Sequence, residues 1–360
     1  MNHSVSYIYL SFLDSNYSRS GVLVNAPKIY SSKIFSQVSS RTLKAIIQLY
    51  KLNKLYEDKN TCFVVMSPCH KLVPLVRLVS RKHVVLDAGW LLLDGHLSRN
   101  PKIKLQKLPE MLKIWLIDII AFHLADMVFV ESEKQKIRIS KNLRMSNHDI
   151  FVSYTSLNEL PFRSANKDSY DIRHEVNIES LSNYKSQIIF RGKTNNESGF
   201  NEVLKAAQML PDYLFFLLID DQYKKAFDLP KNINVRTNFS NEYMKEVYLN
   251  SDIAIGQYSN HPRLKFTIPH KAFEAAFFET AYVSADNPGI REIGDENSVY
   301  FIKEPTAQNL CEAIIKLSHD SELRSSLSKN FNLIYKKFLS QEITLLKFEE
   351  TVRKTLYLNI

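Results

Sequence analysis

The sequence predicts an α/β protein made of two doubly wound parallel-sheet domains. The chain has 360 residues, which is too long for one ordinary core and enough for two domains of roughly 150–200 residues each. Short β-branched or aromatic runs alternate with amphipathic stretches along most of the chain, a pattern typical of parallel sheets covered by helices on both faces. A polar stretch without periodicity, residues 155–185, separates two such series.

The first series contains short apolar runs that predict strands, with helical periodicity between them at Thr42–Tyr56 and Met111–Ala125. The predicted strands are Ser6–Phe12, Cys62–Ser67, His83–Asp87, Met127–Glu131 and Ile150–Tyr154. We assign residues 1–160 to a first Rossmann-like domain.

The second series follows the same pattern over residues 161–340, which we assign to a second Rossmann-like domain. Its predicted strands are Gln187–Arg191, Tyr213–Asp220, Ile233–Thr237, Asp252–Gln257, Ala281–Ala285 and Ser298–Ile302. Its predicted helices are Asn201–Leu210, Glu242–Asn250, Pro269–Glu279, Ala307–Ser318 and Ser321–Phe338. Ligands of such sheets bind beyond the carboxyl ends of the strands, so the loops there are the candidate sites.

The excess positive charge lies entirely in the first half. The chain has a net charge of +9, whereas residues 1–160 carry 22 Lys and Arg against 12 Asp and Glu. This asymmetry indicates an anionic partner of that half: a membrane surface, a nucleic acid or a phosphorylated substrate. Nucleic acid is disfavoured, because the basic residues are dispersed and no nucleic-acid-reading motif is present. Lys102, Lys104 and Lys107 alternate with apolar residues, a pattern that suits an anionic lipid surface or a solvated loop.

The composition restricts the kinds of binding site and the cellular setting that we expect for the chain. The three cysteines, Cys62, Cys69 and Cys311, have no metal-binding spacing, so we expect no metal site and a reduced, cytoplasmic setting. We find no export leader and no apolar run of the roughly 18–20 residues that span a membrane. With only 8 glycines, the chain has no P-loop and no GxGxxG motif.

The most informative segment is Ser251–Ile293. A buried strand and a polar loop, Gln257–Lys265, precede a helix that begins near Pro269 and carries Lys271 and Glu274 on one face. Lysine and free helix N–H groups can offset the charge of a diphosphate, and one fixed carboxylate can accept hydrogen bonds from both hydroxyls of a ribose. The alternative is an ordinary surface ion pair.

The segment resembles the donor-binding part of retaining GT-B glycosyltransferases of glycosyltransferase family 4. The resemblance rests on the Asp252-led strand, on Pro269-His270-Lys271-Ala272-Phe273-Glu274-Ala275 and on the following strand and turn at Ala281–Gly289. Residues 187–210 resemble the family's first strand and helix of the same domain. The likeness covers about residues 185–340 well and the first half in outline.

The resemblance implies a GT-B fold, in which residues 341–360 return as a helix to the first domain. It implies that Glu274 binds the donor ribose, that Lys193 and Lys271 contact the phosphates, and that the backbone at Phe239 and Ser240 packs against the base. Asn287 and Gly289 belong to the turn that completes this site. Two departures weaken the match: Phe266 replaces a frequent glutamate, and Ser198-Gly199 replaces Lys-Gly. Arg263, Lys265 or Lys271 could compensate.

Three loops of the first half are candidates for acceptor binding: Asn16–Gly21, Asp87–His96 and Glu131–Glu133. Asp87 is the preferred catalytic base, since a carboxylate that ends an apolar strand needs a reason to be there. Asp94 and His96 could shape a turn instead, and His123 fits a core or helix-cap position better than a ligand.

Together these features predict a glycosyltransferase that moves a sugar from a UDP- or GDP-sugar to a hydroxyl of a glycan acceptor. The family implies retention at the anomeric carbon, no cofactor besides the donor, and a role with lipid-linked acceptors in cell-surface polysaccharide or lipopolysaccharide synthesis. We expect a cytoplasmic protein, peripheral at the inner face of the membrane. The alternatives are a sugar-nucleotide 2-epimerase of the same fold and a catalytically silent membrane-associated binding protein. The sugar, base, acceptor and linkage stay open.

Overall fold

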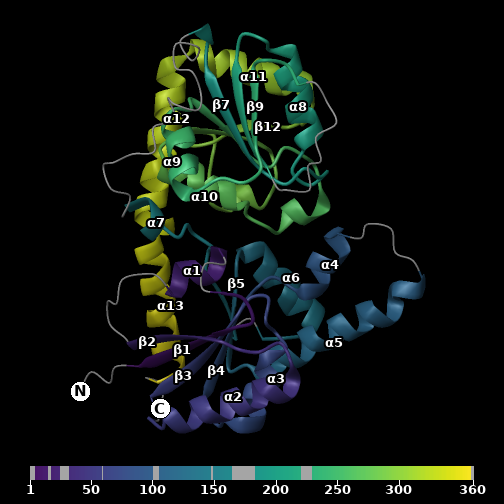
Figure 1. The fold of residues 1–360 in the computed structure, drawn as a ribbon, viewed down its shortest axis with the longest axis vertical. Helices are drawn as coiled ribbons and strands as arrows, with labels where there is room; N and C mark the ends of the chain where they lie inside the picture. The colour runs from purple at the N-terminus through teal and green to yellow at the C-terminus, as the bar shows by residue number, and fades with distance from the viewer. Residues whose placement is uncertain are drawn as a thin grey trace. The chain divides into compact units, whose positions relative to one another are not determined.

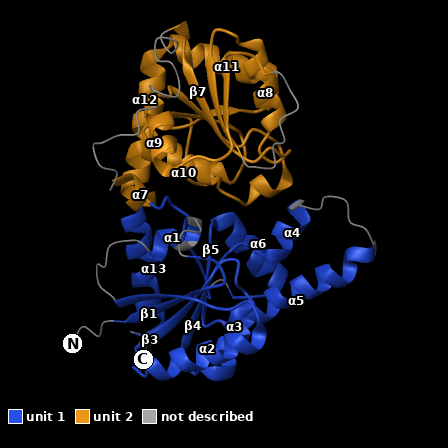
Figure 2. Ribbon diagram, viewed as in Figure 1, with its two compact units in different colours: residues 1–158, 341–360 blue, residues 159–340 orange. Residues whose placement is uncertain are grey.

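The protein divides into two compact units, which Figures 1 and 2 show in a computed structural model. The first unit comprises residues 1–158 and 341–360, and the second comprises residues 159–340. Each contains a six-stranded, all-parallel sheet with helices on both faces, so the predicted α/β, doubly wound fold class is confirmed. The structure describes residues 5–14, 18–24, 32–58, 60–99, 105–146, 149–163, 183–219 and 229–357.

The sheet of the first unit has the strand order β2-β1-β3-β4-β5-β6. Its strands are β1 (Ser6–Ser11), β2 (Ser32–Gln37), β3 (Thr61–Met66), β4 (His83–Gly89), β5 (Met127–Val130) and β6 (Ile150–Val152). Its helices are α1 (Ser18–Val24), α2 (Thr42–Leu55), α3 (Leu72–Val79), α4 (Leu92–Arg99), α5 (Leu108–Leu124), α6 (Glu133–Leu143) and α13 (Gln341–Leu356), and a short 3-10 turn, η1, spans Leu105–Lys107.

Alternating side chains of β1 supply the two cores of this unit. Ile8 and Leu10 pack with α2, α3 and α5 on one face of the sheet, whereas Tyr7 and Tyr9 pack with α13 on the other. The C-terminal helix α13 therefore covers a sheet face built from the first half of the chain. Its Phe348 and Val352 are almost fully buried there.

Three local expectations for this unit are wrong. Strand β2 was not predicted, because its half-exposed sequence SKIFSQ lies at the sheet edge and lacks a long apolar run. Residues 18–21, expected in a loop, begin helix α1, while residues 16 and 17 lie outside the described residues. Asp94 and His96 lie on helix α4 and do not form a turn.

The sheet of the second unit has the strand order β12-β11-β10-β7-β8-β9. Its strands are β7 (Gln187–Gly192), β8 (Leu214–Ile219), β9 (Ile233–Arg236), β10 (Ile253–Ile255), β11 (Ala281–Ala285) and β12 (Tyr300–Ile302). Its helices are α7 (Leu160–Arg163), α8 (Phe200–Met209), α9 (Asn241–Leu249), α10 (His270–Phe277), α11 (Ala307–His319) and α12 (Ser321–Ile334). Short turns of other helix types are η4 (Pro262–Lys265), η5 (Ile290–Glu292) and η6 (Tyr335–Leu339).

The chain proceeds from β7 outward to β9 and then returns to place β10 on the other side of β7. The order of the strands thus reverses between β7 and β10. Doubly wound sheets bind their ligands at such a switch point. The topology therefore directs attention to the carboxyl ends of β7 and β10.

The loops after β7 and β10 are in close contact. Gly199 has a φ of 74°, and a Cβ atom at this position would lie 1.8 Å from the backbone oxygen of Tyr258. The backbone N–H of Tyr258 donates to the oxygen of Ser198 at 3.0 Å. Only glycine allows this approach without a shift of the backbone.

Two features concern membrane contact: the lysines at Lys102, Lys104 and Lys107, and the length of the apolar helices. Lys102 and Lys104 lie outside the described residues, and Lys107 ends η1. Within the described ranges, no helix is long and apolar enough to cross a membrane.

We predict that Gly199→Ala destabilises the second unit by about 2 kcal/mol or more, since the left-handed conformation alone costs roughly 1–2 kcal/mol. The displacement of the Tyr258 backbone adds to this. Urea unfolding of the full chain measures the loss. Gly95→Ala, on helix α4, is the control and should change stability little. Equal stabilities of the two variants would contradict the close approach.

Candidate functional site

The centre of the site in the second unit is the buried carboxylate of Glu274, on helix α10. Its side chain is 1% exposed. Arg191 at the end of β7 donates from Nη1 to Oε1 at 2.5 Å, and Tyr248 of α9 donates from its hydroxyl to Oε2 at 2.9 Å. His270 Nδ1 lies 2.9 Å from Oε1. One carboxylate thus joins β7, α9 and α10 beside the switch point.

The electrostatics of this cluster favour the ionised carboxylate. Burial by itself raises the pKa of Glu274, but Arg191, His270 and Tyr248 outweigh it and lower the pKa to about 2. Burial, and then the Glu274 charge, raise the pKa of Tyr248 well above its usual value, so this hydroxyl stays protonated and can donate. The cluster is therefore an Arg191–Glu274 ion pair completed by the Tyr248 hydroxyl and the His270 ring.

The alternative of an ordinary surface ion pair between Lys271 and Glu274 is wrong, because both side chains are buried. Helix α10 reads HKAFEAAF, and each of its positions from Lys271 to Ala276 is buried. The helix is covered on all sides, so the spacing of Lys271 and Glu274 does not describe an exposed face. A ribose hydroxyl could reach Glu274 Oε1 only in place of Arg191 or His270.

Lys271 lies next to this cluster and is 6% exposed. Its Nζ lies 3.3 Å from the backbone oxygen of Gly256 and 4.1 Å from the centre of the Phe190 ring. A Cβ atom on Gly192 would lie 2.9 Å from this nitrogen, so glycine at the end of β7 leaves room for it. Burial lowers the pKa of Lys271 to about 7, against the attraction of Glu274.

Asn287 and Gly289 hold the loops after β10 and β11 together. Asn287 Nδ2 donates to the backbone oxygen of Ser259 at 3.0 Å, and the backbone N–H of Gly289 donates to the backbone oxygen of Leu264 at 3.1 Å. A Cβ atom on Gly289 would lie 2.3 Å from the oxygen of Thr267. In the structure these two residues shape the edge of the site, and the Gly289 N–H already has a partner.

The other predicted donor-binding residues of this unit lie at loops. Lys193 is exposed directly after β7, and Ser198, which stands in place of the expected lysine, is buried. Phe239 is half-buried, and Ser240 caps α9 by accepting a hydrogen bond from the N–H of Tyr243 at 3.1 Å. Ser240 therefore has a structural role whether or not a base binds beside it.

Three residues were proposed to compensate for the departures from the family pattern at Phe266 and Ser198. Of these three, Lys271 alone is buried next to the cluster around Glu274. Arg263 pairs with Glu197 at 2.9 Å, which joins the loops after β10 and β7. Lys265 is exposed. Phe266 directly follows η4, and its N–H donates to the oxygen of Arg263 at 3.0 Å.

The role of Asp87 as a catalytic base stays a prediction, and in the structure this side chain is enclosed by protein groups of the first unit. Asp87 is fully buried within β4, and Arg19 of α1 donates to both of its carboxylate oxygens at 2.5–3.0 Å. Arg19 Nη1 also donates to the backbone oxygen of Ser153 at 3.1 Å. Arg19 thus pairs with both carboxylate oxygens of Asp87 in a buried ion pair. Its function in the structure is to hold α1 and the end of β6 against β4.

The remaining candidates of the first unit are also engaged with protein groups. Arg138 donates to both oxygens of Asp94 at 2.7 Å. His96 Nδ1 lies 3.8 Å from Glu110, and Glu131 is 3% exposed. His123 lies 2.9 Å from the oxygen of Ile119, one turn earlier on α5, which fits its predicted helix-end position.

Across the described ranges, no group of three His, Cys, Asp or Glu side chains is arranged to hold a metal ion.

Sequence reasoning missed Arg191, Tyr248 and His270 as parts of the site. Two signals were present: an arginine near the end of an apolar strand, and a glutamate inside the apolar run AFEAAFF. Both imply a buried charge that needs a partner. The sequence alone does not pair two residues that are 83 positions apart.

We predict that Glu274→Gln destabilises the second unit in a pH-dependent way. A carboxyl group whose pKa is lowered by folding adds stability above its unfolded value of about 4.3, and the gain is lost as the pH falls toward about 2. The lowered pKa corresponds to on the order of 3 kcal/mol near neutral pH.

Urea unfolding of both proteins at neutral and acidic pH measures this gain. The difference between wild type and Glu274→Gln should shrink as the pH decreases below about 4. Glu279→Gln is the matched control, because Glu279 is exposed just after the same helix. A difference that is independent of pH would contradict the ion pair.

Comparison with known proteins identifies the kind of domain that contains this cluster. Residues 171–332 match the family model described as glycosyl transferases group 1, a segment that contains the whole cluster around Glu274. No curated protein is similar to the chain in sequence.

Solved structures are similar over nearly the full length of the chain. The HepE protein of Anabaena, solved in complex with UDP-glucose, is 12% identical with a TM-score of 0.71, and the match covers 97% of this chain and 99% of that one. A glycosyltransferase from Rickettsia africae is 13% identical with a TM-score of 0.68, and covers 99% of both chains. A Listeria monocytogenes protein described as a UDP-N-acetylglucosamine 2-epimerase is 10% identical with a TM-score of 0.59, covering 99% of this chain and 97% of that one.

At these identities the structural likeness establishes the fold, and the family match identifies the kind of domain. The chain has the GT-B fold and, by the group 1 domain in its second unit, is a glycosyltransferase.

Proposed function

We propose that this chain transfers a sugar from a nucleotide-sugar donor to a hydroxyl of a glycan acceptor, with retention at the anomeric carbon. The observation that carries the proposal is the position of Lys271 and Arg191. Both cationic groups lie at the switch-point edge of the sheet, inside the segment that matches the group 1 family. In the transfer, the bond from the anomeric carbon to the diphosphate oxygen breaks, a bond to the acceptor oxygen forms, and the proton of that hydroxyl passes to the oxygen of the leaving diphosphate.

The cationic groups suit a leaving nucleoside diphosphate. Negative charge develops on its oxygens as the bond to the sugar breaks, and groups already held in place stabilise that charge. We propose that Lys271, Arg191 and Lys193 supply the positive charge that stabilises the diphosphate. The Arg191 side chain is 33% exposed, and Lys193 directly follows β7. Arg191 Nε and His270 Nε2 are buried and have no hydrogen-bond partner among the described residues, as expected of groups that await a ligand.

The rest of the donor is proposed to follow the family pattern. The base packs at Phe239 and Ser240, and the loop held by Asn287 and Gly289 borders the phosphates. UDP is the first nucleotide to test, because the HepE structure contains UDP-glucose; GDP is the alternative. Glu274 is proposed to accept the ribose hydroxyls by exchanging one of its present donors.

The acceptor is proposed to be lipid-linked and to belong to cell-surface polysaccharide or lipopolysaccharide synthesis. Support comes from the family resemblance and from the excess positive charge of residues 1–160, which suits peripheral association with the inner face of an anionic membrane. The 2-epimerase is the less favoured alternative, since that structural match has the lower TM-score.

We predict that binding of UDP is coupled to proton uptake by Lys271. Its pKa of about 7 in the free protein should rise when a diphosphate lies beside it, so affinity should fall as the pH increases above about 7. Near pH 7.5, calorimetry in buffers of different ionisation enthalpy should therefore report a net uptake of protons, by about one-half to one.

Lys271→Met should abolish this uptake and weaken UDP binding about ten- to a hundredfold, the worth of a hydrogen bond to a charged group. Lys329→Met is the control, since Lys329 lies near Ser251 and Asp252, before the amino end of β10. UDP binding without proton uptake would mean that Lys271 does not meet the phosphates, and no binding of UDP or GDP would contradict the proposed donor class.

A second prediction tests the ribose contact of Glu274. Wild-type protein should bind UDP about tenfold more tightly than 2′-deoxy-UDP, because the missing hydroxyl leaves the carboxylate one donor short. Glu274→Gln should bind UDP about ten- to a hundredfold more weakly and discriminate less between the two nucleotides. Glu279→Gln should behave as wild type. Full discrimination in Glu274→Gln would show that Glu274 acts only by holding Arg191.

A further inference from the structure

Arg191 is bound to the cluster around Glu274 less completely than two other arginines of the chain are bound to their partners. Arg19 of the first unit uses all three of its guanidinium nitrogens. Its Nε and Nη2 donate to the Asp87 carboxylate, and its Nη1 donates to the backbone oxygen of Ser153. An arginine held at three points is a fixed part of the fold.

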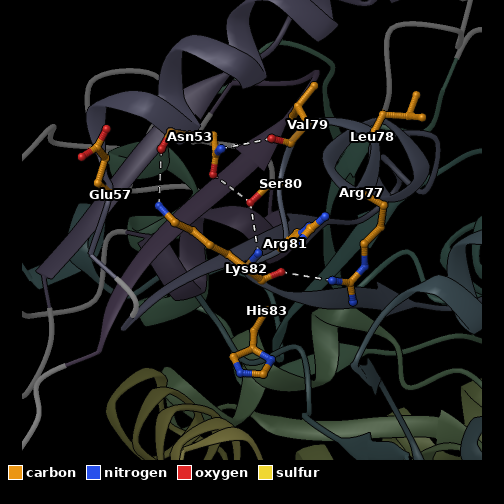
Figure 3. Close-up of a pocket in the computed structure, with 9 residues that line it drawn as sticks. All are labelled: Asn53, Glu57, Arg77, Leu78, Val79, Ser80, Arg81, Lys82 and His83. Atoms are coloured by element: carbon orange, nitrogen blue, oxygen red, sulfur yellow. Dashed lines mark hydrogen bonds between the residues drawn. The ribbon is translucent and has the colours of Figure 1, made fainter.

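Arg77 is held in the same way, at the pocket that Figure 3 shows where β4 begins, at the amino edge of the first sheet. Its Nε donates to the backbone oxygen of Leu124 at 2.8 Å, and its Nη1 donates to the backbone oxygen of Lys82 at 3.1 Å. Its Nη2 lies 2.6 Å from Oδ1 of Asp126. These contacts hold the ends of α3, α5 and β4 together, and the pocket carries no separate proposal.

Arg191, in contrast, is held through one nitrogen. Its Nη1 donates to Oε1 of Glu274, whereas its Nε is buried without a hydrogen-bond partner in the part of the chain that the structure describes. The Arg191 side chain is 33% exposed, compared with 4% for Arg19 and 24% for Arg77. A guanidinium has five N–H donors, so Arg191 has donors left for a ligand.

The other two donors to Glu274 are held more firmly. His270 lies on the same helix as Glu274, four residues earlier, so α10 itself places its ring 2.9 Å from Oε1. Tyr248 donates to the other oxygen, Oε2, and its side chain is almost fully buried. Of the three partners, Arg191 is therefore the group that a ligand can replace.

The place that Arg191 would reach after such a replacement is close by. Gly192 directly follows Arg191, and a Cβ atom on Gly192 would lie 2.9 Å from Nζ of Lys271. An anion bound beside Lys271 is thus within reach of the Arg191 side chain. Arginine suits this anion, because its planar group donates two parallel hydrogen bonds to phosphate oxygens.

We propose that Arg191 occupies the ribose position of the donor site in the free protein and moves to the diphosphate when a nucleoside diphosphate binds. The inference rests on the proposed function, in which Glu274 is the carboxylate that accepts the ribose hydroxyls. These hydroxyls take the place of the Arg191 guanidinium at Glu274, and the diphosphate oxygens become the new partners of Arg191. Hydrogen bonds exchange, and no covalent bond changes.

This exchange makes Arg191 a specificity-determining residue. A nucleoside without phosphate would displace Arg191 but supply no anion for it. A phosphate without ribose would attract Arg191 but leave Glu274 as a buried charge without its ion-pair partner, which is costly. Each part of the ligand therefore binds better when the other part is present, and this coupling acts equally in both directions.

The first test measures this coupling in the wild-type full chain. NMR titration gives the affinity for uridine or guanosine, whichever has the diphosphate that binds, with and without inorganic phosphate at constant ionic strength. Phosphate should tighten nucleoside binding about fivefold or more, the lower range of coupling between two ligands. The 2′,3′-dideoxynucleoside, which has no hydroxyl to offer Glu274, should gain nothing from phosphate.

The second test is Arg191→Met, which should change the two affinities in opposite directions. The nucleoside alone should bind about fivefold more tightly than to wild type and no longer respond to phosphate, because no group has to leave Glu274. The nucleoside diphosphate should bind about tenfold more weakly, since it loses a charged hydrogen-bond donor. Arg324→Met is the matched control, because Arg324 pairs with Asp252 before the amino end of β10, and it should bind as wild type.

Urea unfolding shows whether Arg191→Met is folded, and if it is not, the coupling in the wild type decides. The proposal is overturned if phosphate leaves the nucleoside affinity unchanged, if the dideoxynucleoside gains as much, or if folded Arg191→Met binds nucleoside and diphosphate more weakly alike. In each of these cases the diphosphate still binds and the proposed function stands. Failure of both UDP and GDP to bind would contradict the proposed donor class and this inference together.

Discussion

The ion pair between Arg191 and Glu274 is the constraint on which the ligand edge of the second unit depends. Removing a carboxylate from water is costly, and in the free protein the cost is offset while Arg191, Tyr248 and His270 all stay in place. These three groups come from β7, α9 and α10, so the electrostatic requirement fixes the mutual position of three elements. The position of Lys271, one helical turn earlier, follows from the same constraint.

The first unit uses the same arrangement at the corresponding end of its sheet. Asp87 lies near the end of β4 and is held by Arg19 of α1, whose guanidinium also reaches the backbone of Ser153. In both units a buried carboxylate and an arginine hold together segments that are far apart in sequence. A carboxylate in an apolar segment is thus a sign of a structural ion pair as much as of catalysis, and Asp87 forms such an ion pair in the structure.

The two units present their positive charge in different ways. The second unit carries nearly equal numbers of basic and acidic residues. Its buried cation is Lys271, whose pKa is set by burial and by the nearby Glu274 carboxylate. In the first unit the lysines of α2 and α5 are exposed and lie among apolar side chains. A buried cation can recognise one small anion in a fixed geometry, whereas exposed lysines on an apolar surface suit an extended anionic surface without fixed geometry.

The sequence by itself determined the fold class and the positions of most strands along the chain, because a strand buried on both faces must be a continuous apolar run, as at Thr61–Met66 and Leu214–Ile219. It also drew attention to Lys271 and Glu274, through a spacing that resembles a known family. It did not predict the edge strand β2, where half-exposed residues leave no such run. Only the tertiary structure decided the surroundings of Glu274 and Asp87. Burial, pairing and exposure depend on residues brought together from distant parts of the chain, and local periodicity contains no information about those partners.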